Sequence, residues 1–195
     1  MIDRTAQLAI ALLLVTIFGL GIYAIHLKHR AEVLPQQKIS NRAMAPPAAG
    51  PPQPVTLWVA SDADGLLHER QGSRVLPRDP DLRAREILST LVSMYTDKGS
   101  THPLGAGSEV TDVFLLPDHD AIINTNQAFA DGHRSGILVE EMTVASLAQT
   151  LAANVPGILR VKILVQGQER DTLAGHVDLT TFYNLNQEPW PSADR

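Results

Sequence analysis

Histidines and carboxylates are the side chains of this sequence best suited to chemistry, and one group of them stands at residues 118–120. His119 lies between Asp118 and Asp120, and imidazole and carboxylate groups are common zinc ligands. Pro117 directly precedes them, and proline and aspartate favour a tight turn for conformational reasons alone. The seven histidines show no pair at a metal-ligating spacing within a predicted helix, and the HExxH motif is absent. We therefore expect a turn here and no metal site.

Two further groups of acids call for the same test. Glu140 and Glu141 are adjacent, so on a helix their side chains diverge by about 100° and do not converge on one point. Their place near the start of a predicted helix favours solvated charges that complement the helix dipole. Asp171 and Asp178 flank His176 near the C-terminus, and we interpret this segment as a polar connection between strands.

The common nucleophile and phosphate-binding motifs are absent. The sequence contains neither a GxSxG motif nor a P-loop, and Gly105 and Gly107 are better explained by a turn than by a phosphate-binding loop. The chain has no cysteine, which excludes disulfides, thiol nucleophiles, thiolate zinc sites and thioether lipidation. We assign no catalytic, cofactor-binding or metal-ligating residue, and we expect no cofactor.

One alternative keeps chemistry open. An enzyme or small-ligand receptor, acting on cell-wall material, requires a concave pocket where polar groups converge. His102, His176 and Asp178 are the residues that such a pocket would bring together.

The composition of the chain makes nucleic acid a poor candidate partner. The 195 residues carry a formal net charge of −5 and show no strongly basic domain.

The elements that would position these residues begin with strands. Residues 55–60 alternate and contain β-branched and aromatic residues, which predicts a strand, and residues 66–76 predict one or two short strands split at Gln71-Gly72. A helix follows, with Asp79 as its cap and Pro80 at its first position. Its predicted core face consists of apolar or small residues spaced three and four apart: Ala84, Ile87, Leu88, Leu91, Val92 and Tyr95.

The second half of the domain repeats strands and a helix. Residues 110–116 and 121–124 predict a hairpin, and residues 136–154 predict a helix that is capped by Ser135 and ended by Pro156-Gly157. The predicted core face of this helix is Ile137, Val144, Ala148 and Leu151. A strand at 159–165, with Val161, Ile163 and Val165 on one side and Arg160 and Lys162 on the other, precedes a short strand or arm at 172–179. The order predicts an α+β fold in which two helices pack on one face of a small mixed β-sheet.

The N-terminal segment has the length and composition of a membrane span. Residues 8–27 contain only one ionisable side chain, His26, and a helix of this length spans roughly 30 Å, the thickness of a bilayer core. A cleaved signal peptide is less favoured, because the Ala-x-Ala match at 43–45 is followed by Pro46. We therefore expect an uncleaved anchor within residues 1–30. Basic residues after it favour, by the positive-inside rule, a cytoplasmic C-terminus: Lys28, Arg30, Lys38 and Arg42.

Residues 31–54 predict a linker between the anchor and the domain. Its last ten residues contain five prolines, which lack a backbone donor, so we expect an extended spacer that joins neither sheet nor helix. The domain itself is predicted at 55–183. A loosely ordered tail at 184–195 follows, in which Trp190 is a candidate to dock back on the domain.

Several stretches of the domain resemble the GerMN domain family, named for spore germination and sporulation proteins. They are VTLWVA, HPLGAGSEV, VFLLPDHDAIINTNQAF, LVEEMTVASLAQTLAANVPG and LRVKILVQGQERDTLAGHVDLTTFY. The family typically has V-D-L-S ahead of a phenylalanine, whereas this chain has Ile123-Asn124-Thr125-Asn126 ahead of Phe129. An acid-dependent role at that position is therefore not carried over. The common lipoprotein cysteine is also missing, with the predicted membrane helix in its place.

The resemblance implies a function without catalysis. Domains of this family are generally extracytoplasmic, attached to a membrane and similar in architecture to ring-building modules of envelope assemblies. We expect a single-pass inner-membrane protein whose domain faces the extracytoplasmic side, binds envelope proteins or cell-wall components, and forms a possible homo-oligomer. The expected interaction surface is a helix face, a sheet edge or the loop at 97–109. A cytoplasmic membrane-tethered adaptor remains an alternative, motivated by the basic residues after the anchor.

Overall fold

The computed structural model describes residues 51–186, so the predicted anchor, most of the linker and Trp190 lie outside the described residues. The elements within this range are β1 (Gln53–Ser61), β2 (Leu66–Arg74), α2 (Pro80–Thr96), β3 (Val110–Leu115), β4 (Asp120–Thr125), α3 (Gln127–Asp131), α4 (Ile137–Asn154), β5 (Arg160–Val165) and β6 (Tyr183–Asn184). None of the helices in 51–186 combines the length and the apolar character that crossing a bilayer requires.

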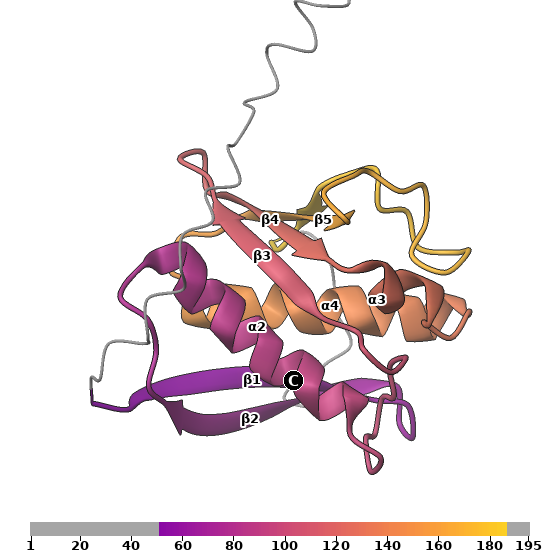
Figure 1. Ribbon diagram of the computed structural model, residues 1–195, viewed down its shortest axis with the longest axis horizontal. Coiled ribbons are helices and arrows are strands. Elements are labelled where there is room, and N and C mark those ends of the chain that lie inside the picture. The colour runs from indigo at the N-terminus through magenta and orange to yellow at the C-terminus, as the bar shows by residue number, and fades with distance from the viewer. Residues whose placement is uncertain (1–50, 187–195) are drawn as a thin grey trace, which may run out of the picture. The chain divides into compact units, whose positions relative to one another are not determined.

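The strands form two sheets, with α2 and α4 between them (Figure 1). One sheet is the antiparallel hairpin β1-β2, and the other has the order β3-β4-β5-β6, in which only β4 and β5 are parallel. The prediction of a mixed α+β domain is confirmed. The prediction of one sheet with both helices on a single face is wrong, because β1 and β2 pack on the opposite side of the helices from the other strands.

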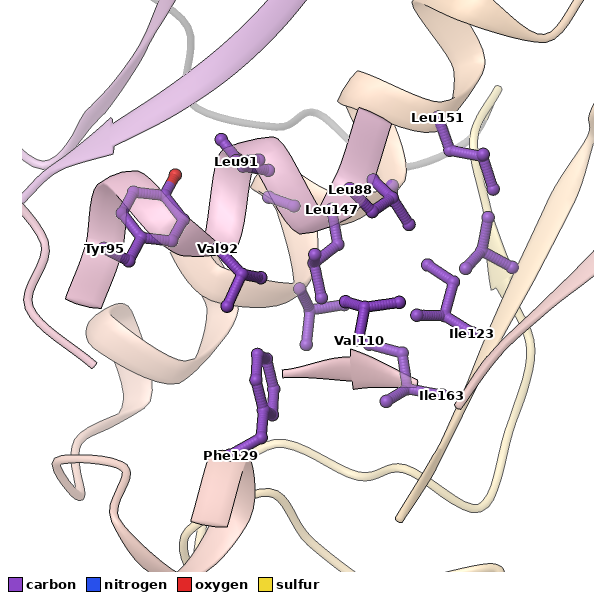
Figure 2. Close-up of a cluster of buried hydrophobic side chains, with 14 of the residues drawn as sticks. Leu88, Leu91, Val92, Tyr95, Val110, Ile123, Phe129, Leu147, Leu151 and Ile163 are labelled. Carbon is purple, nitrogen blue, oxygen red and sulfur yellow. The ribbon is translucent and has the colours of Figure 1, made fainter. Parts of the chain in front are cut away.

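Helix α4 has the sequence of a helix that is covered on several sides. Its residues 142–154 contain no charged side chain, and ten of its residues are buried. Leu147 and Leu151 pack toward Ile123 and Ile163 of the four-stranded sheet (Figure 2), whereas Ser146 and Thr150 bond to β1. A helix without a polar face must be buried all round, which is what a position between two sheets provides.

Helix α2 forms as its sequence predicts. The carboxylate of Asp79 accepts the N–H of Leu82 at 3.0 Å and Pro80 occupies the first turn, so one of the free N–H groups of the helix start is satisfied. All six residues of the predicted core face are buried. Leu88, Leu91, Val92 and Tyr95 belong to the cluster drawn in Figure 2.

The hairpin of β3 and β4 and the alternation of β5 are also confirmed. Other boundaries differ from the prediction. Strand β2 is continuous through Gln71 and Gly72, because Gly72 pairs with Val55 in an unbroken register. Strand β1 begins at Gln53, so the last two residues of the predicted linker join the sheet.

Pro54 is accommodated because its missing N–H would face away from β2. Thr56, two residues on, has the same orientation, and its N–H bonds to the Asn154 side chain rather than to β2.

The start of α4 departs from the prediction as well. Gly136 rather than Ser135 is the cap residue, with a φ of 157°, and no side chain bonds there as a cap. Ile137 is 61% exposed and does not belong to the core. The predicted arm at 172–179 is irregular and contains a single bridge between Thr172 and Asp178.

Candidate functional site

Glu140 is the carboxylate with the most hydrogen bonds among the described residues. It is fully buried, and its Oε2 accepts the N–H groups of Ala174, His176 and Val177 at 3.0, 3.0 and 2.9 Å. Its Oε1 accepts the N–H of Gly136 at 3.1 Å and lies 2.9 Å from Nδ1 of His176. The expectation that Glu140 is solvated is therefore wrong.

Burial and hydrogen bonding act in opposite directions on Glu140. Desolvation by burial raises the pKa of its carboxyl, but the bonds from the Val177 N–H, the His176 side chain and the N–H groups of Gly136 and Ala174 outweigh it and lower the pKa to about 2. The charged form is thus the stable one. Glu140 fastens the segment 174–177 to the start of α4, which is a structural role.

A second polar group lies in the interior, where Thr143 of α4 joins two histidines. Oγ1 of Thr143 lies 2.6 Å from Nε2 of His102 and 2.7 Å from Nε2 of His133. Nδ1 of His102 lies 2.6 Å from the carboxylate of Asp62, which also pairs with Arg134. An acid, an imidazole and a hydroxyl in series is the arrangement of a nucleophilic triad. Here, however, Thr143 and the His102 side chain are fully buried, so substrate cannot reach the hydroxyl.

The proton positions in this network follow from its acceptors. A carboxylate and a carbonyl only accept, so Nδ1–H of His102 donates to Asp62 and Nδ1–H of His133 donates to the Arg134 carbonyl at 2.7 Å. Both neutral rings then present an accepting Nε2 to Thr143, and the Val139 carbonyl lies 3.1 Å from the same Oγ1, so the single hydroxyl proton serves one of three acceptors at a time. Desolvation lowers the pKa of both histidines, against the opposing bonds to Asp62 and to the Arg134 carbonyl.

The remaining interior polar groups bond to the edge of β1 that faces away from β2. The backbone of Thr56 bonds to the Asn154 side chain through both its N–H and its carbonyl, at 3.1 and 2.6 Å. The backbone of Trp58 bonds in the same way to Thr150 and Ser146, at 2.9 and 2.6 Å. The Ala60 backbone bonds to Tyr95 and Thr101. Side chains spaced four apart on α4 thus replace a neighbouring strand.

A groove runs between the hairpin and α2. It consists of two adjoining cavities of about 320 and 440 Å³, which share Arg70 and Met94. Its other lining residues come from β1, β2, α2 and the loop after α2: Val55, Leu57, Val59, Gln71, Gly72, Ser73, Arg74, Thr90, Tyr95, Asp97, Gly99, Ser100 and Thr101. An apolar floor with cations on one rim makes this groove the candidate binding site.

The residues singled out for chemistry are not assembled into one site. His119 has a φ of 63° in the turn between β3 and β4, and Asp120 forms a two-bond pair with Arg160. Within residues 51–186 no group of three or more potential ligands is placed to hold a metal. Gly105 lies in a loop that packs tightly on the backbone of Gly132.

The residues of the predicted pocket are also separate. His102 bonds to Asp62 and Thr143, and His176 bonds to Glu140 and Ser135. Asp178 bonds to Thr180 and Tyr183. These three residues therefore have no bonding partner in common. Sequence reasoning missed Thr143 and His133, because a threonine within a helix and a single histidine in a loop give no signal of their contact.

The fold places the chain among mixed α+β domains of the GerMN type. The first GerMN domain of the sporulation protein GerM from Bacillus subtilis superposes with a TM-score of 0.50, at 19% identity over 69% of this chain and 98% of that chain. The tandem GerMN domains of the same protein give a TM-score of 0.51 at 21% identity, over 67% of this chain and 45% of that chain. A putative lipoprotein from Clostridium perfringens gives 0.43 at 20% identity, over 71% and 93%.

The Germane family model, described as "Sporulation and spore germination", matches residues 56–171, which is more than half of the sequence. The chain belongs to this family. Among curated proteins, no sequence matches the chain. The family is not known as catalytic, which is compatible with a protein that is not an enzyme.

Proposed function

We propose that this protein is a membrane-anchored, extracytoplasmic scaffold that binds proteins of an envelope or sporulation-type assembly and catalyses no reaction. The observation that carries the proposal is the use of the interior polar groups. Glu140, His102 and Thr143 are buried and bonded to other groups of the chain. The side chains that could take part in catalysis therefore stabilise the fold. The open groove is left to bind a partner.

The anchor and the linker support the membrane part of the proposal. Residues 8–27 have the length and composition of a membrane span, and the proline-rich residues 45–52 suit a spacer that holds a domain away from a bilayer. Membership of the Germane family supports a role in sporulation-type assemblies.

Crosslinking tests the binding role. A photoreactive amino acid placed at Arg74, on the groove rim, is expected to yield discrete adducts with envelope proteins in intact cells. The same amino acid at Glu141, which is exposed on α4, serves as the control for non-specific adducts. If adducts from several exposed positions over the whole domain are all absent, the scaffold function is contradicted.

A cytoplasmic membrane-tethered adaptor is the second candidate, favoured by the basic residues that follow the anchor: Lys28, Arg30, Lys38 and Arg42. A reporter that is active only outside the cytoplasm, fused to the C-terminus, separates the two candidates. Activity of this reporter supports the extracytoplasmic scaffold. Activity only of a reporter that requires the cytoplasm supports the adaptor.

A further inference from the structure

Strand β2 has a free backbone edge, and the bonds of β1 define which groups lie on it. The N–H and carbonyl groups of Thr56, Trp58 and Ala60 bond to side chains away from β2. In an antiparallel pair, residues directly opposite one another point their backbone groups either toward each other or both outward. The register therefore puts the outward groups of β2 on Leu67, Glu69, Gln71 and Ser73.

No described residue satisfies these outward groups. The hairpin sheet contains only β1 and β2, and none of the backbone or side-chain hydrogen bonds within 51–186 involves the N–H or carbonyl of these four residues. Residues 69–74 are all exposed, whereas Leu67 is fully buried, so the accessible part of this edge is Glu69, Gln71 and Ser73. A long edge strand of this kind is a template for pairing with another extended chain.

The groove lies along the same strand and is basic at its β2 rim. Alternation places four residues of β2 on one face of the hairpin: His68, Arg70, Gly72 and Arg74. The buried Val55, Leu57 and Val59 of β1 lie on the same face. Neither Arg70 nor Arg74 forms an ion pair with any described acid, and the single lining acid, Asp97, lies at one end. Gly72 has open space where a side chain would be.

We propose that an extended, acidic segment of a partner protein adds to β2 as a third strand, with alternate side chains directed into the groove. Main-chain bonds to Glu69, Gln71 and Ser73 hold the segment, and carboxylates beside Arg70 and Arg74 select it. A small apolar side chain fits over Gly72. This inference rests on the proposed scaffold function and names its mode of binding.

A second copy of the chain is a poorer occupant of this edge. Antiparallel pairing of two β2 strands would gather two copies of Arg70 and Arg74 on one face of the joined sheet. That face of β2 carries no carboxylate, since its residues are His68, Arg70, Gly72 and Arg74. Like charges beside one another across strands are destabilising.

Designed peptides test the proposal on the full-length chain in mild detergent. The probe is the acetylated heptapeptide Thr-Glu-Thr-Val-Thr-Glu-Thr, which places Glu, Val and Glu opposite Arg74, Gly72 and Arg70. Fluorescence anisotropy is expected to show saturable binding, and hydrogen exchange is expected to slow at the outward N–H groups of Glu69, Gln71 and Ser73. The matched peptide with lysine for glutamate is expected to bind about tenfold more weakly, because two exposed charge pairs are lost.

Two variants separate charge from backbone pairing. The double variant Arg70→Glu and Arg74→Glu is expected to reverse the preference between the two peptides. Gln71→Pro removes one outward N–H without removing a bond to β1, as Pro54 already does on β1, and is expected to abolish binding of both peptides. N-methylation of the third and fifth peptide residues, whose N–H groups face β2, is expected to abolish binding, whereas N-methylation of the fourth is not.

The outcomes that contradict the proposal are distinct. Absent or non-saturable binding of the acidic peptide, equal binding of the lysine peptide, or unchanged binding to Gln71→Pro overturns it. A dimer that forms without peptide and is lost in Gln71→Pro overturns it in favour of a second copy. If the peptides fail but crosslinking from other faces still finds envelope partners, only this inference fails and the scaffold function stands.

Discussion

Glu140 and Glu141 are neighbours whose environments differ completely, and this makes them a matched pair for substitution. Glu140→Gln keeps the size of the side chain but turns one of its two accepting oxygens into a donor that opposes N–H groups. We expect a loss of about 2–4 kcal/mol in the free energy of unfolding. Urea unfolding measures this loss, and the exposed Glu141→Gln should stay within about 0.5 kcal/mol. Equal effects at both positions would contradict the structural role of Glu140.

His102 and His133 make the stability of the domain depend on pH. Because burial lowers the pKa of both rings, the unfolded chain takes up protons first as the pH falls below the ordinary histidine value of about 6.5. Stability is therefore complete above that value and decreases below it, by up to about 1.4 kcal/mol per pH unit for each ring.

The check is urea unfolding at pH 7.5 and pH 5.5. His133→Gln removes one of the two rings and is expected to reduce the difference between the two pH values. Glu140, with its pKa of about 2, stays charged in the folded state over this range. A domain more stable at pH 5.5 than at pH 7.5 would refute the assignment.

At the scale of elements, α4 holds the hairpin through side-chain bonds to the edge of β1. Thr150→Val keeps the shape of the side chain but leaves the Trp58 N–H without its partner, so we expect a loss of about 1–3 kcal/mol in the free energy of unfolding. Thr90→Val on α2 is the matched control, because the Thr90 hydroxyl bonds only to the Glu86 carbonyl of its own helix. The control should change stability by less than about 0.5 kcal/mol. A similar loss in both variants would mean that the Thr150 bond contributes nothing specific.

The same elements show how far sequence reasoning reaches. The cap at Asp79 and the six core residues of α2 could be predicted, because both depend on residues within one helix. The position of the hairpin could not, since the alternation of β1 shows that one face is buried but not which layer covers it. The uncharged stretch at 142–154 was the available signal for a helix covered on several sides.

The candidate site shows the same limit. Four of the five bonds of Glu140 come from residues more than thirty positions later in the chain, so its sequence neighbourhood favours the wrong, solvated interpretation. The free edge of β2 depends on the register of a hairpin and on bonds from α4. A sheet edge could be expected as an interaction surface, whereas the particular strand required the structure.

At the scale of the whole molecule, the described domain contains a complete core of its own. The buried residues of both sheets and of α2, α3 and α4 form a single cluster within residues 51–186. We therefore expect the fragment 51–186 to be soluble without detergent and to unfold in one cooperative transition. Trp58 is the sole tryptophan of this fragment and reports the transition by its fluorescence. Aggregation or a gradual transition would show that the domain requires residues outside this range.

The full-length chain is expected to behave differently, because its predicted anchor at 8–27 makes it sediment with membranes and resist alkaline extraction. A charge at the centre of a membrane span costs about 2.5–3.5 kcal/mol. Leu14→Arg combined with Ile17→Arg should therefore release the chain into the soluble fraction, while the matched Leu14→Ala with Ile17→Ala should leave it in the membrane. Because neither pair lies in 51–186, the unfolding of the domain provides the internal control. If the unsubstituted full-length chain were found in the soluble fraction, the predicted anchor would be refuted. The description of the folded domain would not be affected.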